Sequence, residues 1–173
     1  ESVVILLKYL NTPENLVLYP PDNHKKMIEE IYLHLGINPN LKETDKNIEL
    51  TNDESAIDIL TEPHNMVGKI KINQYGKNIL QEVQNHLKAL CLEKMDTIYL
   101  FMKLDNPLTA KYSSEFEKMG FFFSGVMPGS KGKDCLILQY MNNYIIDYTR
   151  LQIPSEMGNK IKDYIHSFDP TQK

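Results

Sequence analysis

Hydrophobic residues recur along this chain with two spacings, one typical of helices and the other of strands. Apolar residues three and four positions apart predict four helices. These helices cover residues 20–36, 76–95, 109–120 and 155–168. The first ends at Gly36 and the last begins at Ser155, which are residue types that commonly end and begin helices. The third has Tyr112, Phe116 and Met119 on its apolar face.

Alternating or continuous apolar runs predict the strands. They lie at residues 3–10, 55–61, 66–74, 97–104, 121–129 and 134–141, with a short further strand expected around residues 48–50. The run 55–61 alternates, so we expect one well-buried face and a hairpin with the run 66–74. The run 97–104 is apolar almost throughout, which is typical of a strand in the middle of a sheet. The order of elements predicts an α/β or α+β sandwich with a mixed sheet and helices on both faces, in a single domain spanning residues 1–173.

Composition narrows the classes of partner. Of 173 residues, 42% are hydrophobic and 24% charged, and the net charge is −4 with the basic residues dispersed. This gives no electrostatic reason to expect a nucleic acid or an anionic membrane as partner. No uncharged apolar run approaches the roughly 18 residues that span a bilayer, and we expect a cytoplasmic protein. Cys91 and Cys135 lie in apolar segments and are expected to be buried free thiols. Because the chain begins at Glu1 without a methionine, we expect it to be part of a longer protein.

Three stretches of the chain resemble the GCN5-related N-acetyltransferase (GNAT) superfamily. "VGKIKINQYGKNILQEVQNHL" resembles the family's central strand, phosphate-binding turn and following helix. "TIYLFMKLDNP" resembles the next strand and its loop, and "FEKMGFFFSGVMPG" resembles the helix end and strand often written Tyr-Glu-Lys-Leu-Gly-Phe. The resemblance covers roughly residues 55–141. It implies the GNAT fold and an N-acyltransferase that uses acetyl-CoA or another acyl-CoA, with a small-molecule or protein amine as acceptor.

A narrower likeness concerns two further stretches. "GFFFSGVMPG", followed by "DCLILQYM" and preceded far upstream by "YPPDNHKKMIEEIYLHLG", is similar to GNAT-like domains of bacterial and archaeal signalling proteins. Some of these domains follow an ATP-binding anti-sigma-factor kinase domain. The likeness therefore implies an N-terminal ATPase or kinase domain as a partner within the full-length protein.

The resemblance places a phosphate-binding turn directly after residues 66–74. The family pattern is a basic residue or glutamine followed by a glycine-rich turn, Arg/Gln-x-x-Gly-x-Gly/Ala, at the start of a helix, where free amides face the pyrophosphate. This chain has Gln74 and Gly76, adds Lys77, has Asn78 nearby and lacks the second glycine. The alternative is a plain strand-to-helix turn in which Gly76 only permits the backbone conformation.

The same strand has a second role in the family, where it bulges and separates from the next strand. Its backbone amides then face the thioester and the pantetheine arm, which assigns cofactor binding here to the strand carrying Ile70 and Ile72. Gly68 is a candidate for the bulge, or else a glycine required by packing.

The family's proton donor is missing from its usual position. A tyrosine four residues before the glycine protonates the departing thiolate in the family, and this chain has Phe116 there. Tyr112 lies one helical turn earlier on the same face and is the candidate catalytic residue, with a core tyrosine as the alternative. Two functions therefore stay open: an acyl-CoA-dependent N-acyltransferase, or an inactive GNAT-like module that binds a ligand or partner and regulates a neighbouring domain.

No other catalytic pattern competes. The five histidines are scattered without the spacing of metal ligands, so no metal site is expected. The sequence has no Gly-x-Ser-x-Gly motif, and its glycine- and lysine-rich "GSKGKD" joins two strands instead of preceding a helix.

Overall fold

The computed structural model describes residues 15–45, 47–129 and 133–172. The strand predicted at residues 3–10 lies outside these ranges. The helices are α1 (Lys25–His34), α2 (Ile79–Leu92), α3 (Pro107–Lys118) and α4 (Glu156–Phe168), with 3-10 turns η1 (Pro63–Asn65), η3 (Tyr148–Arg150) and η4 (Pro170–Gln172). The strands are β1 (Val17–Leu18), β2 (Asn40–Leu41), β3 (Ala56–Glu62), β4 (Val67–Gln74), β5 (Thr97–Lys103), β6 (Phe122–Met127) and β7 (Cys135–Met141).

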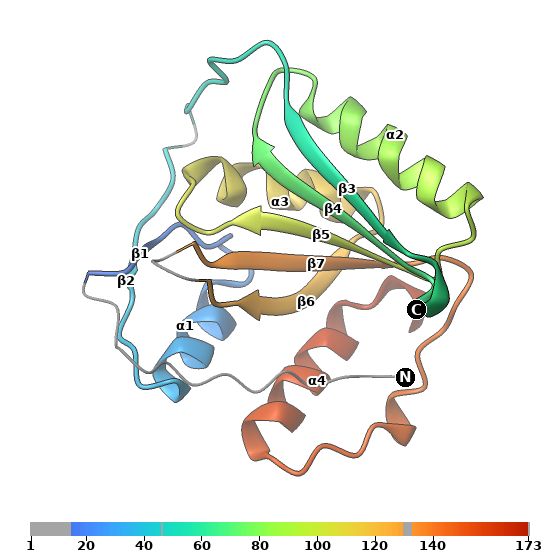
Figure 1. Cartoon of the computed structure of the whole chain (residues 1–173). Helices are drawn as coiled ribbons and strands as arrows, with labels where there is room; N and C mark the ends of the chain where they lie inside the picture. The colour runs from blue at the N-terminus through green and yellow to red at the C-terminus, as the bar shows by residue number, and fades with distance from the viewer. Residues whose placement is uncertain (1–14, 46, 130–132, 173) are drawn as a thin grey trace.

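Five of the strands form one mixed sheet in the order β3-β4-β5-β7-β6 (Figure 1). β3 and β4 are the predicted hairpin, joined through η1 and paired antiparallel. β4 and β5 run parallel because α2 forms the crossover between them, and β7 pairs antiparallel with both β5 and β6. β5 lies in the middle of the sheet, as its apolar sequence predicted. The α/β class with a mixed sheet is confirmed.

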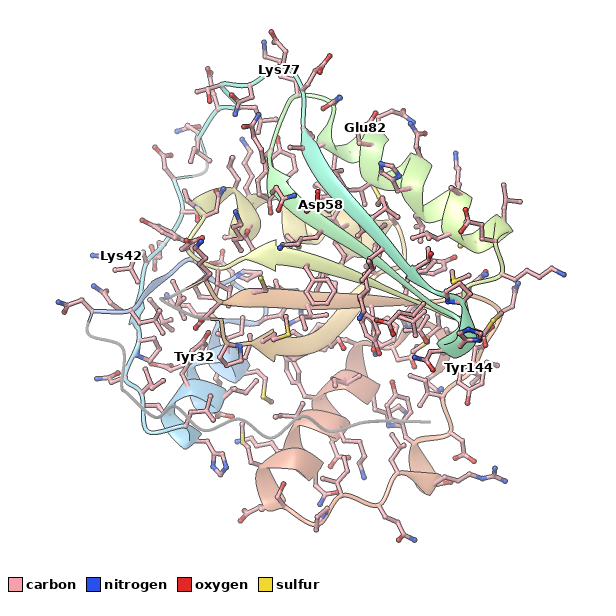
Figure 2. All side chains as sticks on the ribbon, viewed as in Figure 1. Tyr32, Lys42, Asp58, Lys77, Glu82 and Tyr144 are labelled. Atoms are coloured by element: carbon pink, nitrogen blue, oxygen red, sulfur yellow. The ribbon has the colours of Figure 1, made fainter. Side chains whose placement is uncertain are left out.

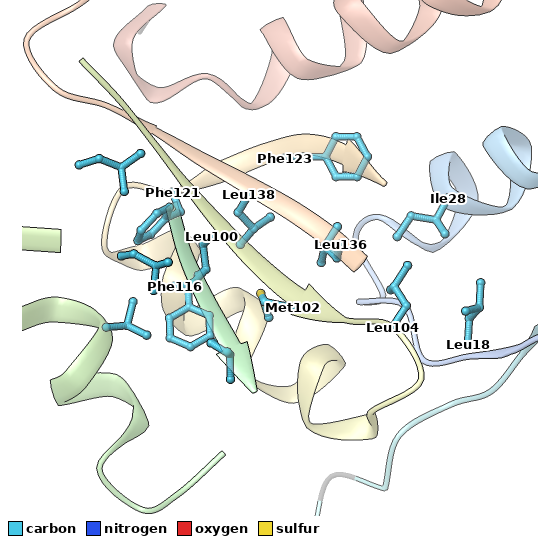
Figure 3. Close-up of a cluster of buried hydrophobic side chains, with 14 of the residues drawn as sticks. Leu18, Ile28, Leu100, Met102, Leu104, Phe116, Phe121, Phe123, Leu136 and Leu138 are labelled. Atoms are coloured by element: carbon cyan, nitrogen blue, oxygen red, sulfur yellow. The ribbon is translucent and has the colours of Figure 1, made fainter. Parts of the chain in front are cut away.

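One face of the sheet packs against α2 and α3. Ile70 of β4 and Leu100 of β5 are register partners on this face, and both are fully buried. Figure 3 shows Phe116 of α3 beside Leu100 and Phe121 in the same apolar cluster. α1 and α4 instead contact each other and the edge strand β6. Ser155 caps α4 as expected, because its hydroxyl accepts the Gly158 amide at 3.1 Å.

Two predicted features differ from the structure. Residues 48–50 form no strand among the described residues, and the carbonyl of Ile48 accepts a hydrogen bond from the Lys111 ammonium. The well-buried face expected for β3 is also wrong. Ile59 is 38% exposed and Leu60 57% exposed, because β3 is the edge of the sheet and has a neighbour on one side only.

Both cysteines are free thiols, as expected. Cys135 is buried, whereas Cys91 is only half-buried, so full burial was correct for Cys135 alone. Within the described ranges, no helix has the length and apolar character needed to cross a membrane.

Candidate functional site

The sheet opens where β4 and β5 approach their carboxyl ends. Register pairs between the two strands run as far as Lys71 and Phe101. Beyond that point, the described residues show no pair between Ile72–Gln74 of β4 and Met102–Lys103 of β5, although β4 stays paired with β3 and β5 with β7. Figure 1 shows the arrowheads of the two strands pointing apart. Each strand is thus held by its outer neighbour, and the backbone edges of β4 and β5 that face each other are no longer paired.

A bulge lies beside this opening. The register of β4 with β3 passes from Ile72 to Gln74 and skips Asn73, which marks an extra residue in β4. Of the two roles considered for Gly68, the bulge is wrong, because Gly68 is paired on both sides. A Cβ at Gly68 would lie 2.9 Å from Leu90 Cδ1, so this glycine serves the packing of α2 on the sheet.

The two isoleucines predicted to contact the cofactor lie on either side of this point. Ile70 is paired with Ile59 on one side and Leu100 on the other, so its backbone belongs to the continuous sheet. Ile72 is paired with β3 alone and lies at the parted edge. Both side chains are buried toward α2 and α3, so only their backbone groups could contact a ligand between the strands.

Gly76 is held by the segment that leads into β3. Its amide donates to Ser55 Oγ at 2.9 Å, and a Cβ at Gly76 would lie 2.1 Å from the carbonyl carbon of Glu54. The Gln74 side-chain amide also donates to this segment, to Glu54 O at 3.3 Å. The backbone φ of Gly76 lies outside the left-handed region, so close approach of Glu54 and Ser55 is the reason for a glycine here.

Lys77 and Asn78 contact the same segment. The Lys77 amide donates to Asn52 O at 3.0 Å, and its ammonium lies 2.7 Å from Asp53 Oδ1. Asn78 Oδ1 accepts the Ser55 amide at 2.8 Å. Figure 2 shows Lys77 at the outer tip of this corner, where its side chain is 65% exposed.

The corner therefore fits a pyrophosphate only in part. The amides of Gly76 and Lys77, which a phosphate-binding turn would present, donate to protein oxygens. The anion beside the Lys77 ammonium is Asp53. A phosphate could bind these groups only if residues 52–55 moved.

Tyr75, directly after β4, is linked to the end of β5 through Thr109 of α3. Its hydroxyl lies 3.0 Å from Thr109 Oγ1, which donates to Lys103 O at 2.6 Å. The Tyr112 ring stacks on the Tyr75 ring with a centroid distance of 5.8 Å. Tyr75 is 3% exposed, and this burial raises the pKa of its phenol far above the usual range. Sequence reasoning missed Tyr75; the signal was a lone aromatic residue in the otherwise polar stretch "NQYGKN".

The two positions on α3 differ in what they offer chemically. Phe116 is fully buried in the apolar cluster and carries no exchangeable proton (Figure 3). Tyr112 is half-buried, and no hydrogen bond of its hydroxyl is found among the described residues. Burial, and secondarily the Glu115 carboxylate, raises the pKa of Tyr112, so its phenol is protonated at neutral pH.

A second buried polar cluster lies away from this corner and was also missed. His24 is fully buried at the start of α1, with Nε2 2.7 Å from Glu117 Oε1 of α3 and Nδ1 2.9 Å from Tyr164 Oη of α4. The Phe123 and Phe168 rings pack against the imidazole at 4.8 and 4.9 Å. His24 thereby ties three helices together, and this role makes it a structural residue.

Comparisons with known proteins add little to this picture. No protein-family model and no curated protein matches the sequence. Among solved structures, the N-terminal domain of a ribosomal-protein-alanine acetyltransferase from Clostridium acetobutylicum ATCC 824 is similar, with 20% identity over 57% of this chain and 88% of that chain. The TM-score is 0.34, which is too low to carry an argument about fold or function.

Proposed function

We propose that this chain is a GNAT-like domain that binds acyl-CoA between β4 and β5 and transfers the acyl group to an amine. The observation that carries the proposal is the opening of the sheet beyond Lys71 and Phe101, with the bulge at Asn73 beside it. The GNAT resemblance predicts a bulge and a separation of these two strands. The order of helices and strands agrees with the resemblance as well.

Different parts of the chain would hold different parts of the cofactor. The backbone edge of Ile72–Gln74 offers hydrogen-bonding groups to the thioester and pantetheine arm. Lys77 and Asn78 would face the phosphates once residues 52–55 gave way. Bound acyl-CoA would supply an activated acyl group to a neutral amine. The chain's own contribution is then to hold the two reactants in one orientation and to manage their protons.

Tyr112 is the residue of this chain suited to donate a proton. Like any tyrosine, it carries a phenolic proton at neutral pH, and it lies one helical turn before Phe116 on the face of α3 that packs on Tyr75. In the proposed reaction it would give this proton to the departing thiolate.

A second function is favoured by two specific observations. Phe116 cannot act as an acid, and the amides of Gly76 and Lys77 already have protein acceptors. Both features suit a GNAT-like module that regulates a neighbouring domain, such as the ATPase or kinase domain of a signalling protein, without transferring an acyl group.

Isothermal titration with acetyl-CoA and a thiol-release assay with a panel of amines separate these functions. Binding together with amine-dependent thiol release supports the transferase, and the Tyr112→Phe variant should then keep binding and lose release by at least about tenfold. Tyr140→Phe is the matched control, since Tyr140 lies on β7 outside the parted edge. Binding without release for any amine favours the regulatory module. No heat and no thermal shift at millimolar acetyl-CoA would reject the acyl-CoA site itself.

A further inference from the structure

One chain of hydrogen bonds joins β4 and β5 again beyond the point where they part. Tyr75 directly follows β4, Thr109 belongs to α3, and Lys103 is the last residue of β5. Lys103 O can only accept, so the Thr109 hydroxyl gives its one proton to this carbonyl at 2.6 Å. The Tyr75 hydroxyl, 3.0 Å away, must then donate to Thr109 Oγ1. The direction of both hydrogen bonds is therefore fixed.

We propose that Tyr75 is a positioning residue and that this Tyr75–Thr109–Lys103 bridge fixes how far β4 and β5 part. The bridge would thereby determine the width of the acyl-CoA site, a statement that rests on the proposed function. Beyond Lys71 and Phe101, each strand has a partner on its outer side only within the part of the chain that the structure describes, so the register pairs do not define the distance between the inner edges.

The bridge has the properties that a spacer needs. An aromatic ring does not shorten, and the stack on Tyr112 together with near-complete burial restricts the ring to one orientation. The bond to Lys103 O attaches the spacer to the backbone of β5 and not to a movable side chain. The far end belongs to β4 itself, because Tyr75 is covalently next to Gln74.

Without the bridge, two outcomes are open to the strands. Their inner edges keep backbone donors and acceptors, so the ends could close into further parallel pairing, or they could move apart. Either change alters the edge offered to a ligand. Removing one hydroxyl should therefore affect the ends of both strands, although Tyr75 lies in neither α2 nor α3, the helices that cover them.

Tyr75→Phe and Thr109→Val test the bridge, because each removes a hydroxyl and keeps the size of the side chain. Tyr148→Phe is the matched control: it removes a buried tyrosine hydroxyl that donates to Asp169 Oδ2 at 2.9 Å, outside the sheet. Hydrogen–deuterium exchange of residues 70–75 and 101–104 reports on the strand ends. Titration with acetyl-CoA reports on the site, and thermal unfolding shows whether the variants lose similar stability.

We expect Tyr75→Phe and Thr109→Val to change exchange in both segments and to weaken acetyl-CoA binding by roughly fivefold to tenfold, the scale of one hydrogen bond. The double variant should be no worse than the poorer single variant. Tyr148→Phe should lower the melting temperature with neither effect. Unchanged exchange in residues 70–75 and 101–104, or equal changes in Tyr148→Phe, would overturn the bridge.

The proposed acyl-CoA site can be rejected independently of the bridge. If exchange changes as expected while the unaltered protein binds no acetyl-CoA, the bridge stands as a spacer between β4 and β5, and the proposed function is rejected. If acetyl-CoA binds with the same affinity to all variants, the bridge does not determine the width of the site.

Discussion

The two ends of β4 are held in different ways. At its start, β4 is paired on both sides, and Gly68 allows the methyl groups of Leu90 to approach the sheet. At its end, β4 has parted from β5, and the chain is held by polar contacts of Tyr75 and Gly76 with distant segments. Methyl groups at the end of a flexible side chain can yield by a few tenths of an ångström, whereas one backbone packed on another cannot. The end of β4 should therefore tolerate an added side-chain carbon less well than its start.

The largest expected effect comes from Gly76→Ala. The new Cβ would lie 2.1 Å from Glu54 C and 2.4 Å from Ser55 N, so the backbone of residues 52–55 or of the corner must move. We expect the free energy of unfolding to fall by about 3 kcal/mol or more, measured by urea denaturation. A loss of less than about 1 kcal/mol would show that the corner adapts as readily as the start of the strand.

Phe116→Tyr should have the next largest effect. Phe116 is fully buried in the apolar cluster beside Leu100, so an added hydroxyl would be desolvated there (Figure 3). We expect a loss of about 2 kcal/mol in chemical denaturation and no gain in acyl transfer, because the phenol would be enclosed by apolar side chains. Increased thiol release with an amine would contradict this and would show that position 116 reaches the site.

Gly68→Ala is the matched test at the start of β4. Its Cβ would meet Leu90 Cδ1 at 2.9 Å and Cδ2 at 3.1 Å, both at the end of a flexible side chain. We expect a loss of about 1 kcal/mol, and the double variant Gly68→Ala/Leu90→Ala should show no additional penalty from the added methyl group. If Gly68→Ala costs as much as Gly76→Ala, the contrast between the two ends is wrong.

The smallest effect on stability is expected for Lys77→Ala. Lys77 is mostly exposed and its ion pair with Asp53 is a surface pair, so the free energy of unfolding should change by less than about 0.5 kcal/mol. If phosphates bind beside Lys77, this variant weakens acetyl-CoA binding, and Asp53→Asn strengthens it by removing the competing carboxylate. If both variants bind acetyl-CoA with the affinity of the unaltered protein, Lys77 does not belong to the cofactor site.

The sequence by itself determined the elements whose signals are local. The helical spacing of Ile79, Val83, Leu87 and Leu90 predicts α2, and alternation on both sides of a short turn predicts the β3–β4 hairpin. A continuous apolar run placed β5 in the middle of the sheet. These features follow from the chain because a helix or strand buries one face at a fixed residue spacing. The absence of an acid at position 116 is likewise a property of the residue itself.

Only the tertiary structure decided what the candidate site residues contact. Gly76 and Ser55 are 21 residues apart, and Tyr75 and Thr109 are 34 apart, so no pattern of nearby residues predicts either pair. The same holds for His24, whose partners lie 93 and 140 residues away. Hydrogen bonds of this kind depend on how helices and strands pack against each other, and the hydrophobic core as a whole determines that packing. Residue types therefore fixed which groups could act at the end of β4, and packing fixed which of them already have partners.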